Sequence, residues 1–247
     1  MKLTVVADIH GNLEALDAVL NEIDASGTDK VVSLGDNVGY GPDPEPVMRI
    51  MTARHIESVL GNHELAVKRP GFERWFNPVS RKAVHHTRAH LSVKSIAQIH
   101  LYPRHRVMGE CWFVHGAPPS SVTLYLFQLP EAKLKSHLTK MAERIVFVGH
   151  THDLGMMIWN GEALESRPVE KGRISLNPRF KYVINAGSVG QPRDGTPHAK
   201  YVVVDTVKNT LEVRYVSYDY EKTAEKIIRA GLPSAFAAKL MPMDHNG

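Results

Sequence analysis

The sequence has one cysteine in 247 residues and contains no long uninterrupted apolar run. One cysteine excludes an internal disulfide and fits a reducing compartment, so we expect a cytoplasmic protein. A membrane span needs about 18 to 20 consecutive apolar residues, and we therefore expect no transmembrane helix. The first residues lack an apolar segment and a small-residue cleavage site, so no signal peptide is expected either.

Several common catalytic motifs are also missing. The sequence contains neither a G-x-S-x-G elbow nor a Walker loop. Cys111 precedes the apolar residues Trp112, Phe113 and Val114, which indicates a buried structural thiol and not a nucleophile. A structural zinc module would require cysteine ligands that the chain does not have. The chemistry must therefore rest on other side chains.

Composition and charge limit the number of domains and the kinds of partner that the sequence allows. Hydrophobic residues make up 43% of the chain, enough for a sizeable core, and we expect a single domain over residues 1–247. The net charge is +4, but residues 68–106 alone hold nine Lys or Arg and one acid. This basic segment attracts phosphate-bearing partners or is a solvated helix face. We interpret residues 65–110 as a basic helical insert near the active site.

The first third of the chain alternates strands and helices. Residues 3–7 form an apolar strand, and Asn12 can cap a helix whose apolar residues recur on one face until Gly27 ends it. Residues 31–34 form the next strand. A strand, a helix and a second strand predict a βαβ unit, and hence parallel strands.

The later half predicts mainly antiparallel strands. Asn160-Gly161 is a strong hairpin signal, residues 173–176 and 180–184 form a second hairpin candidate, and residues 201–205 and 211–216 form a third. Earlier in the chain we expect one helix from about Arg81 to Ile99, capped by Ser80. The pattern favours an α/β fold of two packed mixed sheets with helices outside.

Polar side chains follow five apolar strands at the points where the strands end. The spacing of His150 and His152 sends both imidazoles to the same side of an extended segment. In open α/β sheets, ligands bind beyond the carboxyl ends of the strands, so these groups are expected to meet. They are Asp8/His10, Asp36, Asn62/His63, His115 and His150/His152.

Carboxylates, an amide and several imidazoles are more donors than one four-coordinate zinc ion can use. Two ions that share a carboxylate can use them all. Nitrogen and oxygen donors without thiolate favour divalent or trivalent transition metals such as Mn, Fe or Zn, with Co a further choice. Two such ions about 3.5–4 Å apart clamp a phosphorus centre for in-line attack by the bridging water. Any one of these residues could instead be a polar core residue whose hydrogen bonds are satisfied. This explanation fits the whole set poorly, because all of them stand at the same position after a strand.

At this point the sequence resembles a known family. The strand-end motifs are similar, in order, to the five blocks of the calcineurin-like metallophosphoesterases. Two glycine-containing stretches, 35–42 and 185–194, resemble blocks of the small single-domain bacterial and archaeal members. The five blocks are Asp8-Ile9-His10, Gly35-Asp36, Gly61-Asn62-His63-Glu64, His115-Gly116 and Gly149-His150-Thr151-His152.

The resemblance implies a four-layer αββα sandwich with a binuclear metal site at the strand ends. It implies two ligand sets that share Asp36 as a bridge, and a non-ligand His63 that stabilises the phosphoryl group and protonates the leaving oxygen as a general acid. The family often has Asp after this histidine, whereas this chain has Glu64, which can still orient the ring. The first ligand set is Asp8, His10, Asp36 and His152, and the second is Asp36, Asn62, His115 and His150.

Two further residues are candidates for substrate binding. Arg193 lies in a loop rich in glycine, serine and proline, where its guanidinium can bind a substrate phosphate or pair with Asp194. Tyr40 can stack on a nucleobase at the rim or pack as an ordinary core tyrosine. Asn185 and Ser188 fit hydrogen bonds that fix a loop.

The leading hypothesis is a metal-dependent hydrolase of phosphodiester or phosphoanhydride bonds. A metal-bridging hydroxide would attack a small nucleotide-like substrate, for example a dinucleoside polyphosphate. A nuclease is the alternative within the class, although no nucleic-acid motif is present. A non-catalytic scaffold on the same fold is the alternative outside it, and such a scaffold should lack ligands that this chain retains.

Overall fold

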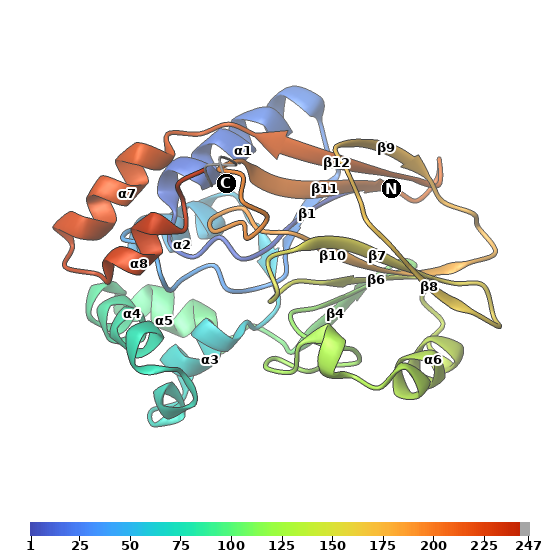
Figure 1. Ribbon diagram of the computed structural model, residues 1–247, viewed down its shortest axis with the longest axis horizontal. Helices are drawn as coiled ribbons and strands as arrows, with labels where there is room; N and C mark the ends of the chain where they lie inside the picture. Colours follow the sequence, from blue (N-terminus) through green and yellow to red (C-terminus); the bar gives the residue numbers. More distant parts are fainter. Residues whose placement is uncertain (243–247) are drawn as a thin grey trace, which may run out of the picture.

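The computed structural model describes residues 1–242, which form two six-stranded sheets with helices outside them (Figure 1). The first sheet contains, in spatial order, β3 (Glu57–Ser58), β2 (Lys30–Ser33), β1 (Lys2–Val6), β11 (Ala199–Asp205), β12 (Thr210–Val216) and β9 (Gly172–Ser175). The second contains β4 (His105–Met108), β5 (Cys111–Val114), β6 (Ile145–Val148), β10 (Lys181–Ala186), β7 (Leu154–Trp159) and β8 (Leu164–Arg167).

Both sheets are mixed. In the first sheet β1, β2 and β3 are parallel, and in the second β5, β6 and β10 are parallel. The remaining neighbours pair antiparallel, including the predicted hairpins β7–β8 and β11–β12. The parallel strands of each sheet therefore end at a common edge, which the predicted βαβ unit requires.

The layers follow from the faces that each element buries. Leu3, Val5, Phe113 and Phe147 belong to the core between the sheets. The outer face of the first sheet packs on α1 and α2, and the outer face of the second packs on α6. This order confirms the predicted αββα sandwich. These helices are α1 (Leu13–Ser26), α2 (Pro44–Ala53) and α6 (Glu131–Lys140).

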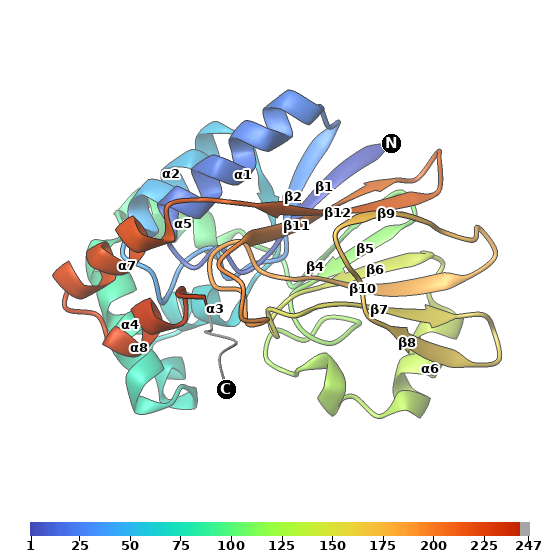
Figure 2. The same cartoon turned by 45° about the horizontal axis from the view of Figure 1, so that its top comes forward.

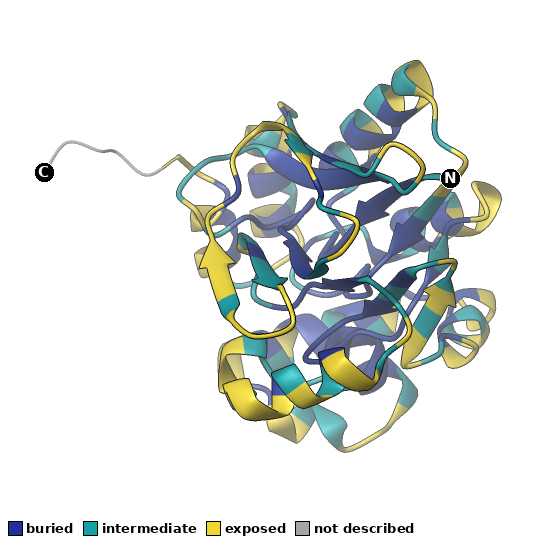
Figure 3. Ribbon diagram, turned by 90° about the vertical axis from the view of Figure 1, so that its right-hand side faces the viewer, coloured by how far each residue is buried: buried dark blue, intermediate teal, exposed yellow. Residues whose placement is uncertain are grey.

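A further group of helices gathers at one end of the two sheets (Figure 1). Figure 2 shows α1 running along the first sheet toward this group, and Figure 3 shows buried strands inside and exposed helix surfaces outside. No helix within residues 1–242 is long and apolar enough to cross a membrane. The group consists of α3 (Asn62–Lys68), α4 (Pro78–His90), α5 (Val93–His100), α7 (Tyr220–Arg229), α8 (Ser234–Ala238) and the 3₁₀ turn η1 (Phe72–Trp75).

The prediction for α1 is confirmed in detail. The side chain of Asn12 accepts a hydrogen bond from the backbone N–H of Ala15 at 3.1 Å and so caps the first turn. Leu16 and Ile23 are buried on the face toward the sheet. Gly27 ends the helix with φ of 67°, a left-handed conformation that glycine adopts without strain.

The single predicted helix from Arg81 to Ile99 is wrong, because two helices occupy this segment. Asn77 caps the first by accepting from the N–H of Ser80 at 2.8 Å, so Ser80 lies inside the first turn. The backbone is extended at the buried Leu91, and Ser92 caps a second helix. Burying Leu91 and capping at Ser92 outweigh the propensity for a continuous helix.

The second predicted hairpin is also wrong. Strand β9 pairs with β12 in the first sheet, whereas β10 pairs with β6 and β7 in the second. The chain crosses between the sheets near residues 176–180. Leu176 and Ile184 both pack into the inter-sheet core from opposite sheets, and a local hairpin would have placed them in one sheet. Cys111 is buried as predicted, and burial raises the pKa of its thiol to about 12.

The inter-sheet core provides a stability test. Phe147 is fully buried and stacks on Phe113 with ring centroids 5.4 Å apart. We expect Phe147→Ala to lower the free energy of unfolding by about 3–5 kcal/mol, because truncation leaves a cavity between the sheets. Urea denaturation measures this loss. Phe127→Ala, at a position that is 74% exposed, should change it by no more than about 0.5 kcal/mol. Equal losses in both variants would contradict this assignment of the core.

Candidate metal centre

The common edge of the parallel strands brings together all seven side chains that the sequence predicts as ligands. Each side chain follows the carboxyl end of a parallel strand, as the rule for open α/β sheets requires. None is more than 4% exposed. The seven are Asp8, His10, Asp36, Asn62, His115, His150 and His152.

The first group of donors surrounds the imidazole nitrogens of His10 and His152, whose Nε2 atoms are 3.0 Å apart. Oδ1 of Asp8 lies 3.6 Å from Nε2 of His152 and 3.9 Å from Nε2 of His10. Oδ2 of Asp36 also lies 3.9 Å from Nε2 of His10. These four atoms are close enough to ligate one ion.

The second group centres on Nε2 of His115. Oδ1 of Asn62 lies 3.0 Å from this nitrogen, Nδ1 of His150 lies 3.1 Å from it, and Oδ2 of Asp36 lies 3.4 Å from it. The same Asp36 oxygen thus approaches both groups. This is the position that a bridging carboxylate must occupy.

Backbone carbonyls orient the four imidazoles. A carbonyl oxygen only accepts hydrogen bonds, so the ring nitrogen that faces it carries the proton and the opposite nitrogen presents a lone pair. Those lone pairs point into the two donor groups. The contacts are His10 Nδ1 to Val38 at 3.2 Å, His152 Nδ1 to Gln191 at 2.6 Å, His115 Nδ1 to Leu34 at 2.9 Å and His150 Nε2 to Thr123 at 3.2 Å.

The protonation of the donors fits a cation. Burial holds the pKa values of His10 and His152 well below the ordinary value and lowers that of His150 to about 3, so all three rings are neutral at pH 7. The facing Nε2 atoms of His10 and His152 then share no proton, and two lone pairs 3.0 Å apart repel each other unless a cation lies near both.

The environments of the carboxylates Asp8 and Asp36 also favour a positive charge between the donors. Oδ1 of Asp8 is buried and has no hydrogen-bond partner among residues 1–242, and burial raises the pKa of Asp8 to about 7. Burial would lower the pKa of His115, but Asp36 beside it raises that pKa to about 9. Asp36 thus favours a positive charge at this point. The residues present fit divalent or trivalent cations held by nitrogen and oxygen.

The backbone at the ligands is strained. Asp8, His10, Asp36, His150 and His152 all have φ between 51° and 71°, in the left-handed region that non-glycine residues avoid. Hydrogen bonds within the site hold these conformations, including His10 N to the carbonyl of Asp36 at 2.9 Å and His150 N to Oδ2 of Asp8 at 3.1 Å. Five ligands thus adopt backbone conformations that are locally unfavourable. The tertiary contacts that position these donors outweigh the conformational preference of each residue.

Glu64 has a different role from the one that the resemblance suggested. Its fully buried carboxylate accepts backbone N–H bonds from Asp36 at 2.8 Å, Asn37 at 2.7 Å, Val38 at 3.2 Å and Gly61 at 3.1 Å. Burial, with Asp36 nearby, raises its pKa to about 7. Glu64 therefore joins the loops after β2 and β3 and fixes the backbone of Asp36.

Asn185 and Ser188 make the loop-fixing hydrogen bonds that the sequence predicted. The hydroxyl of Ser188 donates to the carbonyl of Asp8 at 2.8 Å. The amide nitrogen of Asn185 donates to the hydroxyl of Thr151 at 2.7 Å, between the ligands His150 and His152. The end of β10 and the residues that follow it thereby tie the ends of β1 and β6 together.

A cavity of about 280 Å³ opens over the donors. Its floor includes Asp36, Asn62, His150 and His152, and Tyr40 and Arg193 also line it. The sequence did not single out its other lining residues for the site. They come from the basic segment and from the loop between β5 and η2 (Leu126–Gln128), and none of them lies directly at the end of a strand, where the sequence pattern would have identified it. These residues are Trp75, Phe76, Asn77, Ser80 and Tyr125.

His63 is buried beside the donors and is not among the residues that line the cavity. Its imidazole, with His10 and Asp36, forms a third group whose ligand atoms all lie within 4.8 Å of one another, so the geometry alone does not exclude it as a ligand. Its ring is 4.9 Å from that of His10, 4.4 Å from Tyr40 and 4.8 Å from Phe76. Its Nδ1 atom has no hydrogen-bond partner in the described chain. Burial lowers the pKa of His63 to about 4, below the near-neutral value expected of a general acid.

Arg193 is free to face the cavity because Asp194 pairs elsewhere. Asp194 binds Nζ of the buried Lys200 at 2.7 Å, which contradicts the alternative of a surface pair between Arg193 and Asp194. Arg193 donates to the carbonyl of Thr151 at 3.4 Å, and its Nε has no partner within residues 1–242. Tyr40 packs its ring against His10 and Phe236.

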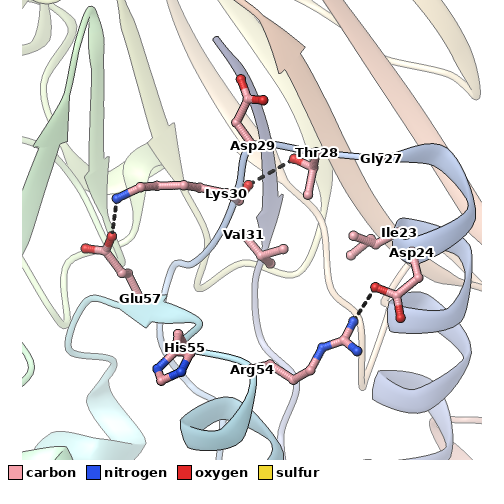
Figure 4. Close-up of a pocket in the computed structure, with 10 residues that line it drawn as sticks. All are labelled: Ile23, Asp24, Gly27, Thr28, Asp29, Lys30, Val31, Arg54, His55 and Glu57. Atoms are coloured by element: carbon pink, nitrogen blue, oxygen red, sulfur yellow. Dashed lines mark hydrogen bonds and ion pairs between the residues drawn. The ribbon is translucent and has the colours of Figure 1, made fainter.

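A larger cavity of about 580 Å³ lies at the opposite edge of the first sheet, where β2 begins (Figure 4). Its charged side chains pair with one another, Lys30 with Glu57 at 2.8 Å and Arg54 with Asp24. None of the predicted ligands or substrate-binding residues lines it. Although this cavity is the larger of the two, it is therefore not the candidate functional site.

The shared carboxylate provides a test of the centre. We expect the Mn²⁺-loaded protein to retain two ions after gel filtration, and Asp36→Asn to lose both, because Asp36 Oδ2 approaches both donor groups. Metal content per chain measures this loss. Asp153→Asn, which removes a charge from an exposed neighbour of His152, should retain both ions. Two ions in Asp36→Asn would exclude a bridge.

The comparisons with known proteins agree with this geometry. The family model of the calcineurin-like phosphoesterase superfamily domain matches residues 1–209. An uncharacterised protein of Methanocaldococcus jannaschii is 32% identical over 241 residues, which are 96% of either chain. A metallophosphoesterase from Sphaerobacter thermophilus has a crystal structure with a TM-score of 0.82 at 30% identity, covering 97% of this chain and 98% of that one.

A hypothetical protein from Pyrococcus horikoshii shares the fold with a TM-score of 0.75 at 17% identity, over 98% of both chains. The predicted family is thus confirmed over most of the chain. This chain belongs to the calcineurin-like phosphoesterase superfamily, a family of metal-dependent phosphoester hydrolases.

Proposed function

We propose that the protein hydrolyses phosphodiester or phosphoanhydride bonds of a small nucleotide-like substrate at the candidate metal centre. The observation that carries this proposal is the position of Asp36 Oδ2, 3.9 Å from Nε2 of His10 and 3.4 Å from Nε2 of His115. One carboxylate oxygen between two groups of lone-pair donors supports a pair of ions. Mn, Fe and Zn suit this donor set.

When bound, the two ions would supply an activated water and neutralise the phosphoryl oxygens. Asp8, His10, Asp36 and His152 would hold one ion. Asp36, Asn62, His115 and His150 would hold the other. The carbonyl contacts of the imidazoles keep each lone pair directed at its ion without rearrangement, so the protein's contribution is preorganisation.

Arg193 would bind a phosphate oxygen of the substrate. Its guanidinium lines the cavity beside His152, and the pairing of Asp194 with Lys200 leaves it without a carboxylate partner in that loop. Within residues 1–242 Arg193 forms no ion pair, and a planar cation in that state beside a polar cavity suits recognition of a phosphate group.

His63 would donate a proton to the leaving oxygen. Its pKa of about 4 makes the ring neutral at pH 7, as burial requires. A phosphate in the cavity would bring negative charge beside the ring, which raises the pKa and favours the protonated form. Nδ1 of His63 is buried against Gly39, so the contact with the leaving oxygen would be made by Nε2.

Metal removal tests the proposed reaction. Chelator-treated protein should lose hydrolysis of bis(p-nitrophenyl) phosphate, because the donors alone supply no activated water. Mn²⁺ should restore the rate, measured as nitrophenolate release. Full activity in the metal-free protein would contradict the proposed function. So would a reconstituted protein that hydrolyses neither this ester, nor nucleotide phosphodiesters, nor the phosphoanhydride bonds of dinucleoside polyphosphates.

Replacing His63 separates catalysis from metal binding. His63→Ala should keep both ions but lower kcat by about 10²–10⁴-fold, the usual contribution of general acid catalysis. The matched control is His105→Ala, at an exposed position on β4. It should leave kcat unchanged. Loss of metal from His63→Ala would make His63 a ligand and remove its proposed role.

A further inference from the structure

Trp75 differs from the other aromatic residues of the cavity in its exposure. It ends the 3₁₀ turn η1 of the basic segment and is 48% exposed, whereas the neighbouring Phe76 is 5% exposed. It lines the same cavity as the metal-donor residues Asp36 and His150. An indole that is half open to solvent at the wall of a polar cavity is a surface on which a planar ligand group can rest.

Aromatic neighbours hold the indole in place. The ring of Phe72 stacks on Trp75 with centroids 5.9 Å apart and planes 12° apart, and Phe76 meets it edge-on at 5.2 Å. Phe76 in turn packs on His63. The indole is therefore buttressed from within the segment, and its orientation toward the cavity requires no ligand to fix it.

The indole also faces a metal-donor residue. The rings of Trp75 and His150 are within 28° of parallel, with centroids 6.4 Å apart. By comparison, the rings of Tyr125 and His150 stack directly at 4.0 Å. A planar group bound against Trp75 would thus lie beside His150 of the second donor group.

The two tyrosines of the cavity are less suited to this role. Tyr125 already stacks on His150 and, at 5.1 Å and 10°, on Phe127. The ring of Tyr40 lies within 5 Å of three other rings, those of His10, His63 and Phe236. Of the two roles that the sequence left open for Tyr40, stacking on a nucleobase and packing in the protein, these contacts favour packing.

We propose that Trp75 is a specificity-determining residue that stacks on a planar aromatic group of the substrate, a nucleobase or an aryl ring. The phosphate attached to that group lies over the metal donors beside Arg193. The inference rests on the proposed function and narrows its substrate to phosphoesters with one such ring in the cavity. A volume of about 280 Å³ is small for a ligand pocket and suits a single ring with its phosphate.

Two ligands that differ by one base test the proposal. Adenosine 5′-monophosphate and ribose 5-phosphate share the sugar and the phosphate, so the ratio of their Kd values isolates the base. Calorimetry on the Mn²⁺-loaded protein should give about tenfold tighter binding of the nucleotide, as base stacking on an aromatic side chain provides. The nucleotide should also quench tryptophan fluorescence more than the sugar phosphate does.

Variants assign that ratio to Trp75. Trp75→Ala should reduce the ratio to about one, while Trp75→Phe should restore part of it because a smaller aromatic face remains. Leu101→Ala, at a 75% exposed position in the same basic segment, should keep the wild-type ratio. An unchanged ratio in Trp75→Ala would overturn the proposal. If that variant does not fold, an equal Kd for the two ligands in the wild-type protein would overturn it.

The outcomes separate this inference from the proposed function. Metal-dependent hydrolysis of phosphodiesters without a preference for the nucleotide would reject stacking on Trp75 and leave the function standing. A preference that depends on Trp75, in a protein that hydrolyses neither phosphodiesters nor phosphoanhydrides, would reject the function and keep the binding site. Aryl and methyl esters with the same leaving group distinguish a general aromatic preference from one for nucleobases.

Discussion

Repulsion between buried lone pairs is the constraint on which the site depends. Four imidazoles donate a ring N–H to backbone carbonyls, and their remaining nitrogens point at one another and at two carboxylates. Such an arrangement is unfavourable in a water-poor crevice unless positive charge lies among the donors. The low pKa values of the neutral histidines and the raised pKa of Asp8 are consequences of this same burial.

The surrounding structure stabilises the unfavourable backbone conformations that this arrangement of donors requires. Several ligands adopt left-handed backbone conformations, and neighbouring backbone and side-chain hydrogen bonds hold them there. Gly39 and Gly61 allow the close approach, because a Cβ at Gly39 would collide with the ring of His63 and one at Gly61 with Asp36. Glu64 completes the assembly by accepting four N–H bonds at the junction of these loops.

Different parts of the chain supply reactivity and selectivity. The sheet edge supplies the metal donors, and every donor is tied to a buried parallel strand. The walls of the cavity come instead from the basic segment and the loop that carries Tyr125, which lie outside the sheets. A fold of this kind can keep its chemistry while its loops change the substrate. Many cations of the basic segment are engaged in the protein, as Arg88 is with Glu73 and Arg106 with Glu57.

The sequence by itself determined the family, the layered fold and the donor set. Apolar strands that end in Asp, Asn or His carry this information locally, and the rule for parallel strands converts it into one site. The same local reasoning predicted the Asn12 cap and two of the three hairpins, since turn and capping chemistry depend on neighbouring residues.

Only the tertiary structure decided which contacts form between distant segments. The crossing from β9 to β10 depends on which sheet each strand joins, and the break at Leu91 depends on a core that packs after the chain collapses. The pairing of Asp194 with Lys200, the four amides around Glu64 and the exposure of Trp75 are likewise products of packing. No local pattern records them, because each depends on residues brought together by the fold.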